Sequence, residues 1–204
     1  MKNQAADIGH DELLKMALHA IRAGRHEQAI DLLTRACEAS PYNGELLYLL
    51  AAEYAQIGLT MCACELMARA IELAPDLHIA RLQLGMLHLS AGNAALGIKV
   101  ISPLMTLLQD DWLGYFARGL VHLCQDEFAE CRQMLERGIS LNNANPALNS
   151  DMEKILASIA SGDGGSEGGA SEGGASEGGA SPSVTISRSI WLAAYQADPD
   201  LPGH

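Results

Sequence analysis

The sequence repeats itself every 34 residues, and this period limits the chain to folds in which one small unit is stacked several times. When the sequence is shifted by 34 residues, Gly24 falls on Gly58 and then on Gly92. Three more columns hold mostly small residues: Ala17, Ala51, Gly85 and Gly119; Ala29, Ala63, Gly97 and Cys131; and Ala36, Ala70, Leu104 and Gly138. Four units fit without an insertion, at residues 10–43, 44–77, 78–111 and 112–145.

The columns predict a helical hairpin in each unit. Two antiparallel helices approach closely only where their side chains are small. The column glycine ends the first helix in a left-handed turn, and Pro41 and Pro75 stop the second helix of their units. Leu and Ala dominate an aliphatic composition in which aromatic residues make up only 4%, which favours helices over a sheet. We therefore predict an all-α fold of stacked helix pairs.

The last two units depart from the pattern. In the third unit Leu104 replaces a small residue, and Pro103 lies inside the second helix, where it is expected to kink that helix. In the fourth unit Asp126 takes the place of the turn glycine and Asn143 that of the proline. The two units nevertheless keep the 34-residue phase.

A ninth helix is predicted at residues 146–160. It begins with a proline, which is favourable in the first helical turn. Its apolar residues recur at helical spacing on one side; they are Leu148, Met152, Ile155, Leu156 and Ile159. This single stripe is expected of a helix that caps the last pair.

The unit resembles the tetratricopeptide repeat. The resemblance rests on the small residues at places 8, 20 and 27, the glycine between the helices and the proline near the end. It implies that residues 1–161 form a right-handed superhelical α-solenoid of four helix pairs plus the capping helix. It also implies that places 2, 5, 9 and 12 of each unit, here called the inner columns, line a concave groove.

The inner columns are almost entirely apolar. In order of the units they hold Asp11, Leu14, Leu18 and Ile21; Glu45, Tyr48, Ala52 and Ala55; Ile79, Leu82, Met86 and Leu89; and Leu113, Phe116, Leu120 and Leu123. Leu49 was assigned to the same surface. Family members that bind acidic chain ends present Lys, Arg and Asn there, because a carboxylate needs cationic and amide donors. This groove instead predicts an apolar peptide or amphipathic helix as ligand. The alternative is that these side chains are core.

A Gly/Ser/Glu tract follows the helical part. Residues 166–181 read "SEGGASEGGASEGGAS", one five-residue unit written three times without variation, which is typical of an engineered flexible linker. We assign residues 162–181 to that linker and residues 182–204 to a tethered ligand peptide. The predicted anchors of the peptide are Ile186, Ile190, Trp191, Leu192 and Tyr195, with Arg188 near Asp11 or Glu45. The alternative is a disordered native terminus.

The charge of the chain disfavours some partners. The formal net charge is −12, and both the helical part and the segment from residue 162 onward carry an excess of acids. Nucleic acid and anionic membranes are therefore disfavoured. The chain has no long apolar run and its first residues show no apolar leader, so a cytoplasmic location is expected.

The sequence contains few features that would indicate an enzyme. It contains no phosphate-binding loop, nucleophile elbow or zinc-protease motif. Cys62 and Cys64 are two residues apart, on different faces of a helix. Cys124 and Cys131 flank a turn beside His122, and we interpret them as packed, reduced thiols rather than metal ligands. We therefore expect a non-enzymatic protein without cofactor or metal.

Three hypotheses for the function remain. The first is an adaptor or chaperone that holds an apolar segment of a client protein; in size and charge the chain resembles small acidic tetratricopeptide chaperones of bacterial secretion systems. The second is a scaffold subunit that docks one helix of a permanent partner. The third is a domain-swapped dimer in which each tail enters the groove of its neighbour.

Overall fold

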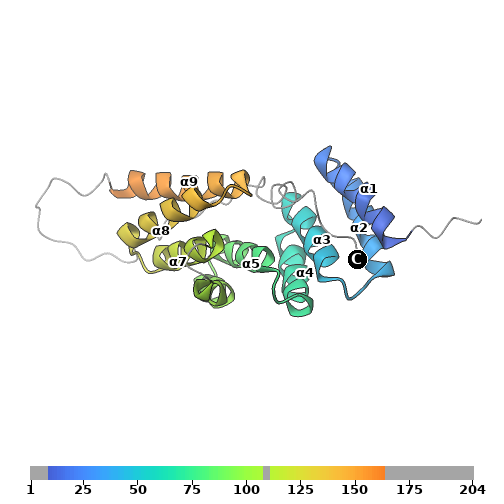
Figure 1. Cartoon of the computed structure of the whole chain (residues 1–204), viewed down its shortest axis with the longest axis horizontal. Helices are drawn as coiled ribbons and strands as arrows, with labels where there is room; N and C mark the ends of the chain where they lie inside the picture. The colour runs from blue at the N-terminus through green and yellow to red at the C-terminus, as the bar shows by residue number, and fades with distance from the viewer. Residues whose placement is uncertain (1–8, 108–110, 164–204) are drawn as a thin grey trace, which may run out of the picture.

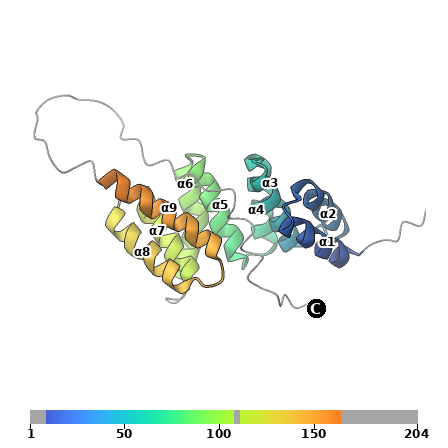
Figure 2. The ribbon, with the colours of Figure 1, turned by 90° about the horizontal axis from the view of Figure 1, so that it is seen from above.

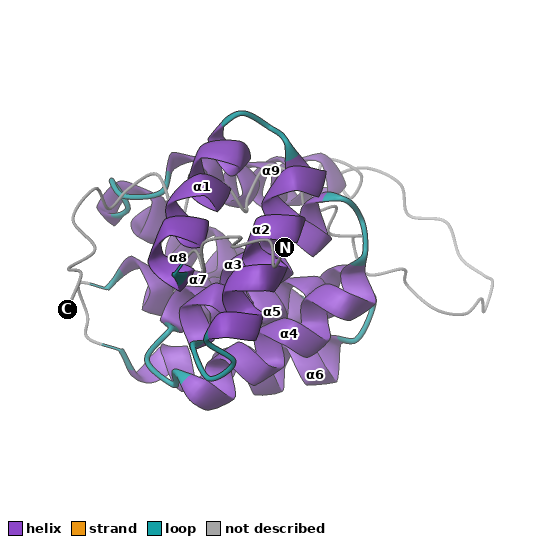
Figure 3. Ribbon diagram, turned by 90° about the vertical axis from the view of Figure 1, so that its right-hand side faces the viewer, coloured by secondary structure: helices purple, strands orange, loops and turns teal. Residues whose placement is uncertain are grey.

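A computed structural model describes residues 9–107 and 111–163, the last two of them without side chains. The helices are α1 (His10–Arg22), α2 (His26–Ala39), α3 (Gly44–Gln56), α4 (Thr60–Leu73), α5 (His78–Ser90), α6 (Ala94–Ile101), the 3₁₀ helix η1 (Ser102–Thr106), α7 (Trp112–Cys124), α8 (Phe128–Leu141) and α9 (Pro146–Asp163). Within the described ranges the chain forms helices and turns and no strand (Figure 3). The all-α prediction is confirmed.

The helices pack in the order of the sequence. Helices α1 and α2, α3 and α4, α5 and α6, and α7 and α8 form the four predicted pairs, and each pair contacts the next. The pairs follow one another along the long axis of the molecule (Figure 1). Helix α9 lies against α8 at the far end, as Figure 2 shows from above. The array is therefore a solenoid of four pairs with a capping helix.

The turn between the two helices of each pair uses one left-handed residue. Gly24, Gly58 and Gly92 have φ values of 67°, 84° and 78°, and Asp126 at the same place of the fourth unit has a φ of 58°. In the first turn the Arg25 N–H donates to the Ala20 carbonyl, and the same bond recurs 34, 68 and 102 residues later. This Schellman arrangement satisfies carbonyls at the end of the first helix. Glycine therefore recurs at this position because the turn requires a positive φ.

The small-residue columns lie where the paired helices touch. A Cβ atom at Gly119 on α7 would lie 2.5 Å from Leu135 Cδ2 on α8, and one at Gly138 would lie 2.5 Å from the Phe116 ring. In the first two units the same columns hold alanines, all of them fully buried. Larger residues there would force the paired helices apart.

The second helix of the third unit is distorted at the position where a kink was predicted, and the α-helix ends there. Helix α6 ends at Ile101, and residues 102–106, which include Pro103, continue as η1. Leu104, at the place of a small residue, is 1% exposed and belongs to the core. A 3₁₀ turn moves the backbone off the α-helical path, and Pro103 cannot donate the helical hydrogen bond.

Helix α3 divides the interior into two clusters. Leu46, Leu49 and Leu50 pack with α1 and α2, whereas Leu47 and Ala51 belong to the larger cluster that extends to α9. Ten of the thirteen residues of α3 are buried. A helix that is apolar on all sides is expected where both sides are covered.

The predicted linker and ligand peptide lie outside the described residues, apart from the first two residues of the linker, which continue α9 to Asp163. The anchors Ile186, Ile190, Trp191, Leu192 and Tyr195 are therefore not placed. Among the described helices none is long and apolar enough to cross a membrane.

Candidate peptide-binding surface

The structure places the fourteen residues predicted to bind a peptide on α1, α3, α5 and α7. Nine of them are buried: Ile21, Tyr48, Leu49, Ala52, Leu82, Met86, Phe116, Leu120 and Leu123. The other five are half-buried: Leu14, Leu18, Ile79, Leu89 and Leu113. These five, here called the half-buried set, are the predicted residues that offer most apolar area to a partner.

Phe116 illustrates the buried group. Its ring packs edge-on against Trp112, with the ring centroids 5.5 Å apart, and fills the space left by Gly138 on α8. Fully buried aromatic rings of this kind hold a helix pair together. Phe116 therefore lies in the core of the fourth unit.

Leu49 occupies a different column from the rest. It is at the sixth place of its unit and packs in the cluster formed with α1 and α2. The sixth-place column holds Lys15, Leu49, Gln83, Ala117 and, on α9, Asp151. This column adjoins the inner columns but faces the preceding unit, because successive residues turn 100° around a helix.

Two members of the sixth-place column are polar and buried. Gln83 is 0% exposed, and among the described residues neither its amide nitrogen nor its amide oxygen has a hydrogen-bond partner. Asp151 is 3% exposed and lies 2.9 Å from the ammonium group of Lys154. Buried amide groups without a partner destabilise a fold, so Gln83 is a weak point between the second and third units.

A histidine and a glutamate link the first two units. His26 Nδ1, at the start of α2, lies 2.8 Å from Glu53 Oε2 on α3, whose side chain is 3% exposed. Burial raises the pKa of the Glu53 carboxyl, and the hydrogen bond with His26 lowers it part of the way back. The sequence did not predict this pair, because its two residues lie 27 positions apart, in adjacent units.

A network of asparagines fixes the turn between α8 and α9. The Asn142 amide nitrogen donates to the Asn145 carbonyl and to Asn149 Oδ1, at 3.0 and 2.8 Å. The Asn142 Oδ1 accepts from the N–H groups of Ala144 and Asn145, and Asn145 Oδ1 accepts from the Leu148 N–H. The asparagine-rich stretch 142–149 was a signal for such caps that the sequence analysis did not use.

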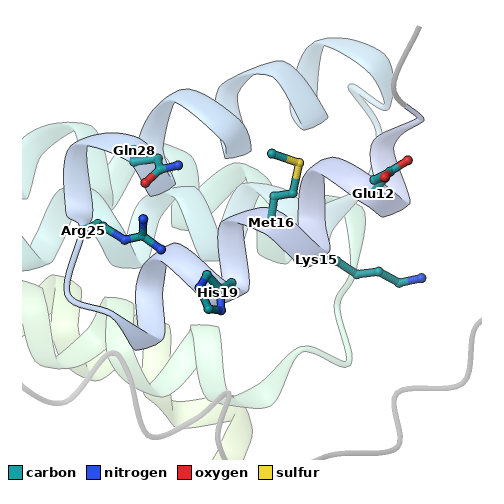
Figure 4. A pocket seen from close by; sticks show the side chains of 6 residues that line it. All are labelled: Glu12, Lys15, Met16, His19, Arg25 and Gln28. Carbon is teal, nitrogen blue, oxygen red and sulfur yellow. The ribbon is translucent and has the colours of Figure 1, made fainter. Parts of the chain in front are cut away.

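The outer side of the first helix pair carries a polar hollow. It has a volume of about 450 Å³ and is lined by Glu12, Lys15, Met16, His19, Arg25 and Gln28. Figure 4 shows four of these side chains along α1, Arg25 at the turn and Gln28 on α2. Three of the six are cationic or can become so, against one carboxylate.

The cysteines are poorly suited to nucleophilic chemistry. Burial raises the pKa of Cys131 to about 11, with a further rise from neighbouring Cys124 and a small decrease from Arg132. Burial also raises the pKa of the thiols of Cys37, Cys64 and Cys124. These four groups are therefore protonated at neutral pH and weakly reactive.

His122 forms a hydrogen bond with a glutamate and not a metal site with Cys124 and Cys131. Its Nδ1 lies 2.6 Å from Glu127 Oε2, across the turn between α7 and α8. Among the described residues no group of three or more His, Cys, Asp or Glu side chains could hold a metal ion.

Comparison with known proteins finds solved structures that are similar to this chain, among them several of MamA. No protein-family model and no curated protein sequence matches it. A crystal structure of MamA superimposes with a TM-score of 0.57 at 20% identity, over 68% of this chain and 81% of that one. MamA from Desulfovibrio magneticus RS-1, from residue 41 to its end, superimposes with a TM-score of 0.56 at 13% identity, over 78% of this chain and 97% of that one.

Identities this low establish the fold and no more. The shared features are the chain of helix pairs and their arrangement in space. Together with the 34-residue period, they identify the described part of this chain as a tetratricopeptide-type solenoid, similar in fold to MamA.

Proposed function

We propose that the array is a non-enzymatic adaptor or chaperone that holds a short apolar segment of a client protein against the inner columns of its first helices. The observation that carries this proposal is the half-buried set, whose five members are all aliphatic. Ile79 and Leu113 stand at the same place of adjacent units, and Leu14 and Leu18 are one turn apart on α1. Aliphatic side chains at such spacing suit an amphipathic helix or an extended apolar strand.

The segment 182–204 is the proposed ligand, or a copy of one. It is too short to bury Ile190, Trp191, Leu192 and Tyr195 in a core of its own. A flexible linker of about 20 residues holds it at an effective concentration on the order of millimolar, which favours occupancy of a weak site. Attachment to the array would then convert a weak complex into a stable one.

Two other roles use the same surface. A scaffold subunit would keep its partner permanently, and a domain-swapped dimer would place the tail of one copy on a second copy. The segment beyond α9 is long enough for docking within one chain and for the swap. The molecular mass in solution distinguishes a monomer from the swapped dimer.

Hydrogen exchange on the full chain tests the proposal. We expect amides of residues 186–195 to exchange about tenfold or more slowly than those of the linker, because a docked segment exchanges only when it is released. Leu18→Glu should abolish that protection, since it adds a charge to the half-buried set. Met61→Glu is the matched control, because Met61 is 76% exposed on α4.

The readout separates binding from folding. Both variants should retain the helical circular dichroism and the protection of α3 and α7. If residues 186–195 exchange as fast as the linker in the unmodified chain, the proposed recognition of the tail is wrong.

A further inference from the structure

The outward side of α1 differs in composition from the helix surfaces that pack between adjacent units. In the second unit, places 3, 6, 7 and 10 of the first helix pack against the first unit, and in the fourth unit places 3 and 7 contact the end of the third unit. In the second unit these places are Leu46, Leu49, Leu50 and Glu53, all buried. In the first unit they are Glu12, Lys15, Met16 and His19, all exposed. A face of this composition does not suit another apolar helix pair.

The same four residues form most of the polar hollow described above. Arg25 and Gln28 complete it from the turn and from α2 (Figure 4). Lys15, Arg25 and, when protonated, His19 outnumber the carboxylate of Glu12. The hollow is thus locally cationic in a chain whose net charge is −12. Such a site favours an acidic ligand.

The hollow adjoins the proposed peptide-binding surface. Lys15 and His19 directly follow Leu14 and Leu18 along α1, so they lie 100° further around the same helix. A peptide that contacts Leu14 and Leu18 and continues past the first unit would therefore meet Lys15 and His19 next.

We propose that residues 196–204 of the same chain dock in this hollow, with Asp198 and Asp200 paired to Lys15 and Arg25. Residues 162–204 contain one arginine against six acids, and these two aspartates lie three and five residues after Tyr195, the last residue of the apolar stretch 190–195. The inference rests on the proposed function and adds the direction of the ligand: its carboxyl-terminal side lies at the first unit. From Asp163 to Asp198 the extended chain spans up to about 115 Å, more than the stack of five helix layers at about 10 Å each.

Zero-length coupling of carboxylates to lysine amines in the full chain tests this placement. We expect Asp198 and Asp200 to couple to Lys15 at least about fivefold more often than to Lys99, because coupling without a spacer is efficient only where a carboxylate and an amine are held in contact. Lys99 is the internal control, since it is exposed on α6 away from the hollow. The linker glutamates Glu167, Glu172 and Glu177 report the yield of random encounters.

Arg25→Gln should lower the yield of the Lys15 products, whereas Arg69→Gln, at an exposed position of α4, should leave it unchanged. Equal coupling of the two aspartates to Lys15 and Lys99, with residues 186–195 still protected from exchange, would overturn the docking and leave the proposed function intact. If residues 186–195 were not protected from exchange, both the docking in the hollow and the proposed function would be wrong. Products that join isotope-labelled to unlabelled chains would overturn docking within one chain.

Discussion

His26 Nδ1 and Glu53 Oε2 lie 2.8 Å apart and tie the start of α2 to the buried side of α3. In the 34-residue register Glu53 matches Leu87 and Val121, both buried and apolar. The second unit thus places a carboxylate where later units place a hydrocarbon. His26 supplies the partner that makes this burial tolerable.

The stability contributed by Glu53 depends on pH. Burial raises the pKa of its carboxyl, so the folded protein binds the proton more tightly than the unfolded chain. The stabilisation is complete below the unfolded pKa and is lost as pH rises through the raised folded pKa. We expect the advantage of Glu53→Gln over the unmodified protein to grow from pH 4 to pH 7 in urea unfolding. The exposed Glu72→Gln should show no such trend.

Gln83 should be replaceable with a gain in stability. Its amide is fully buried and has no hydrogen-bond partner in the part of the chain that the structure describes, and the same column of the second unit holds Leu49. Gln83→Leu removes the unpaired amide and should raise the free energy of unfolding by about 1–3 kcal/mol. The reciprocal change, Leu49→Gln, should lower it. A loss of stability in Gln83→Leu would mean that the amide is hydrogen-bonded.

Asn142 should be essential for the attachment of α9. Its side chain donates two hydrogen bonds and accepts two within the turn, and it is 2% exposed. We expect Asn142→Ala to lower the free energy of unfolding by about 2–4 kcal/mol, because several buried partners lose their bonds together. The exposed neighbour Asn143 is the matched control. Hydrogen exchange of α9 should accelerate only in the Asn142 variant.

Replacing Asp126 in its left-handed turn should stabilise the protein slightly. At a φ of 58° a side chain is disfavoured, although Asp tolerates this region better than most residues. Asp126→Gly should therefore raise the midpoint of thermal unfolding, corresponding to roughly 0.5–1 kcal/mol. Gly58→Ala, at a φ of 84°, should have the opposite sign. An unchanged midpoint in both variants would contradict the assignment of strain to this place.

Phe116 and Leu113 should respond differently although both stand in the inner columns. Phe116 is fully buried, so Phe116→Ala should lower the free energy of unfolding by about 3–5 kcal/mol. Leu113 is half-buried, so Leu113→Ala should cost less stability while reducing the exchange protection of residues 186–195. Similar losses of stability at both places would indicate that Leu113 is also core.

Much of the fold could be read from the sequence because its signals repeat. A turn glycine, a small residue at a helix contact and a proline each act locally, and the 34-residue period marks them in several copies. Pro103 likewise predicted a distortion in the second helix of the third unit, where α6 ends at Ile101 and η1 begins. The binding surface was harder, because the inner columns are apolar whether or not a neighbour covers them.

The sequence by itself determined the helices, their pairing and the turns, since these depend on backbone conformation and on side chains close in the chain. Only the tertiary structure decided which inner-column residues are buried, that Glu53 meets His26, that Gln83 has no partner among the described residues and that a hollow with Lys15 and Arg25 lies beside α1. Burial and pairing of this kind arise where adjacent units meet, and the contacts across such a junction join residues far apart in sequence.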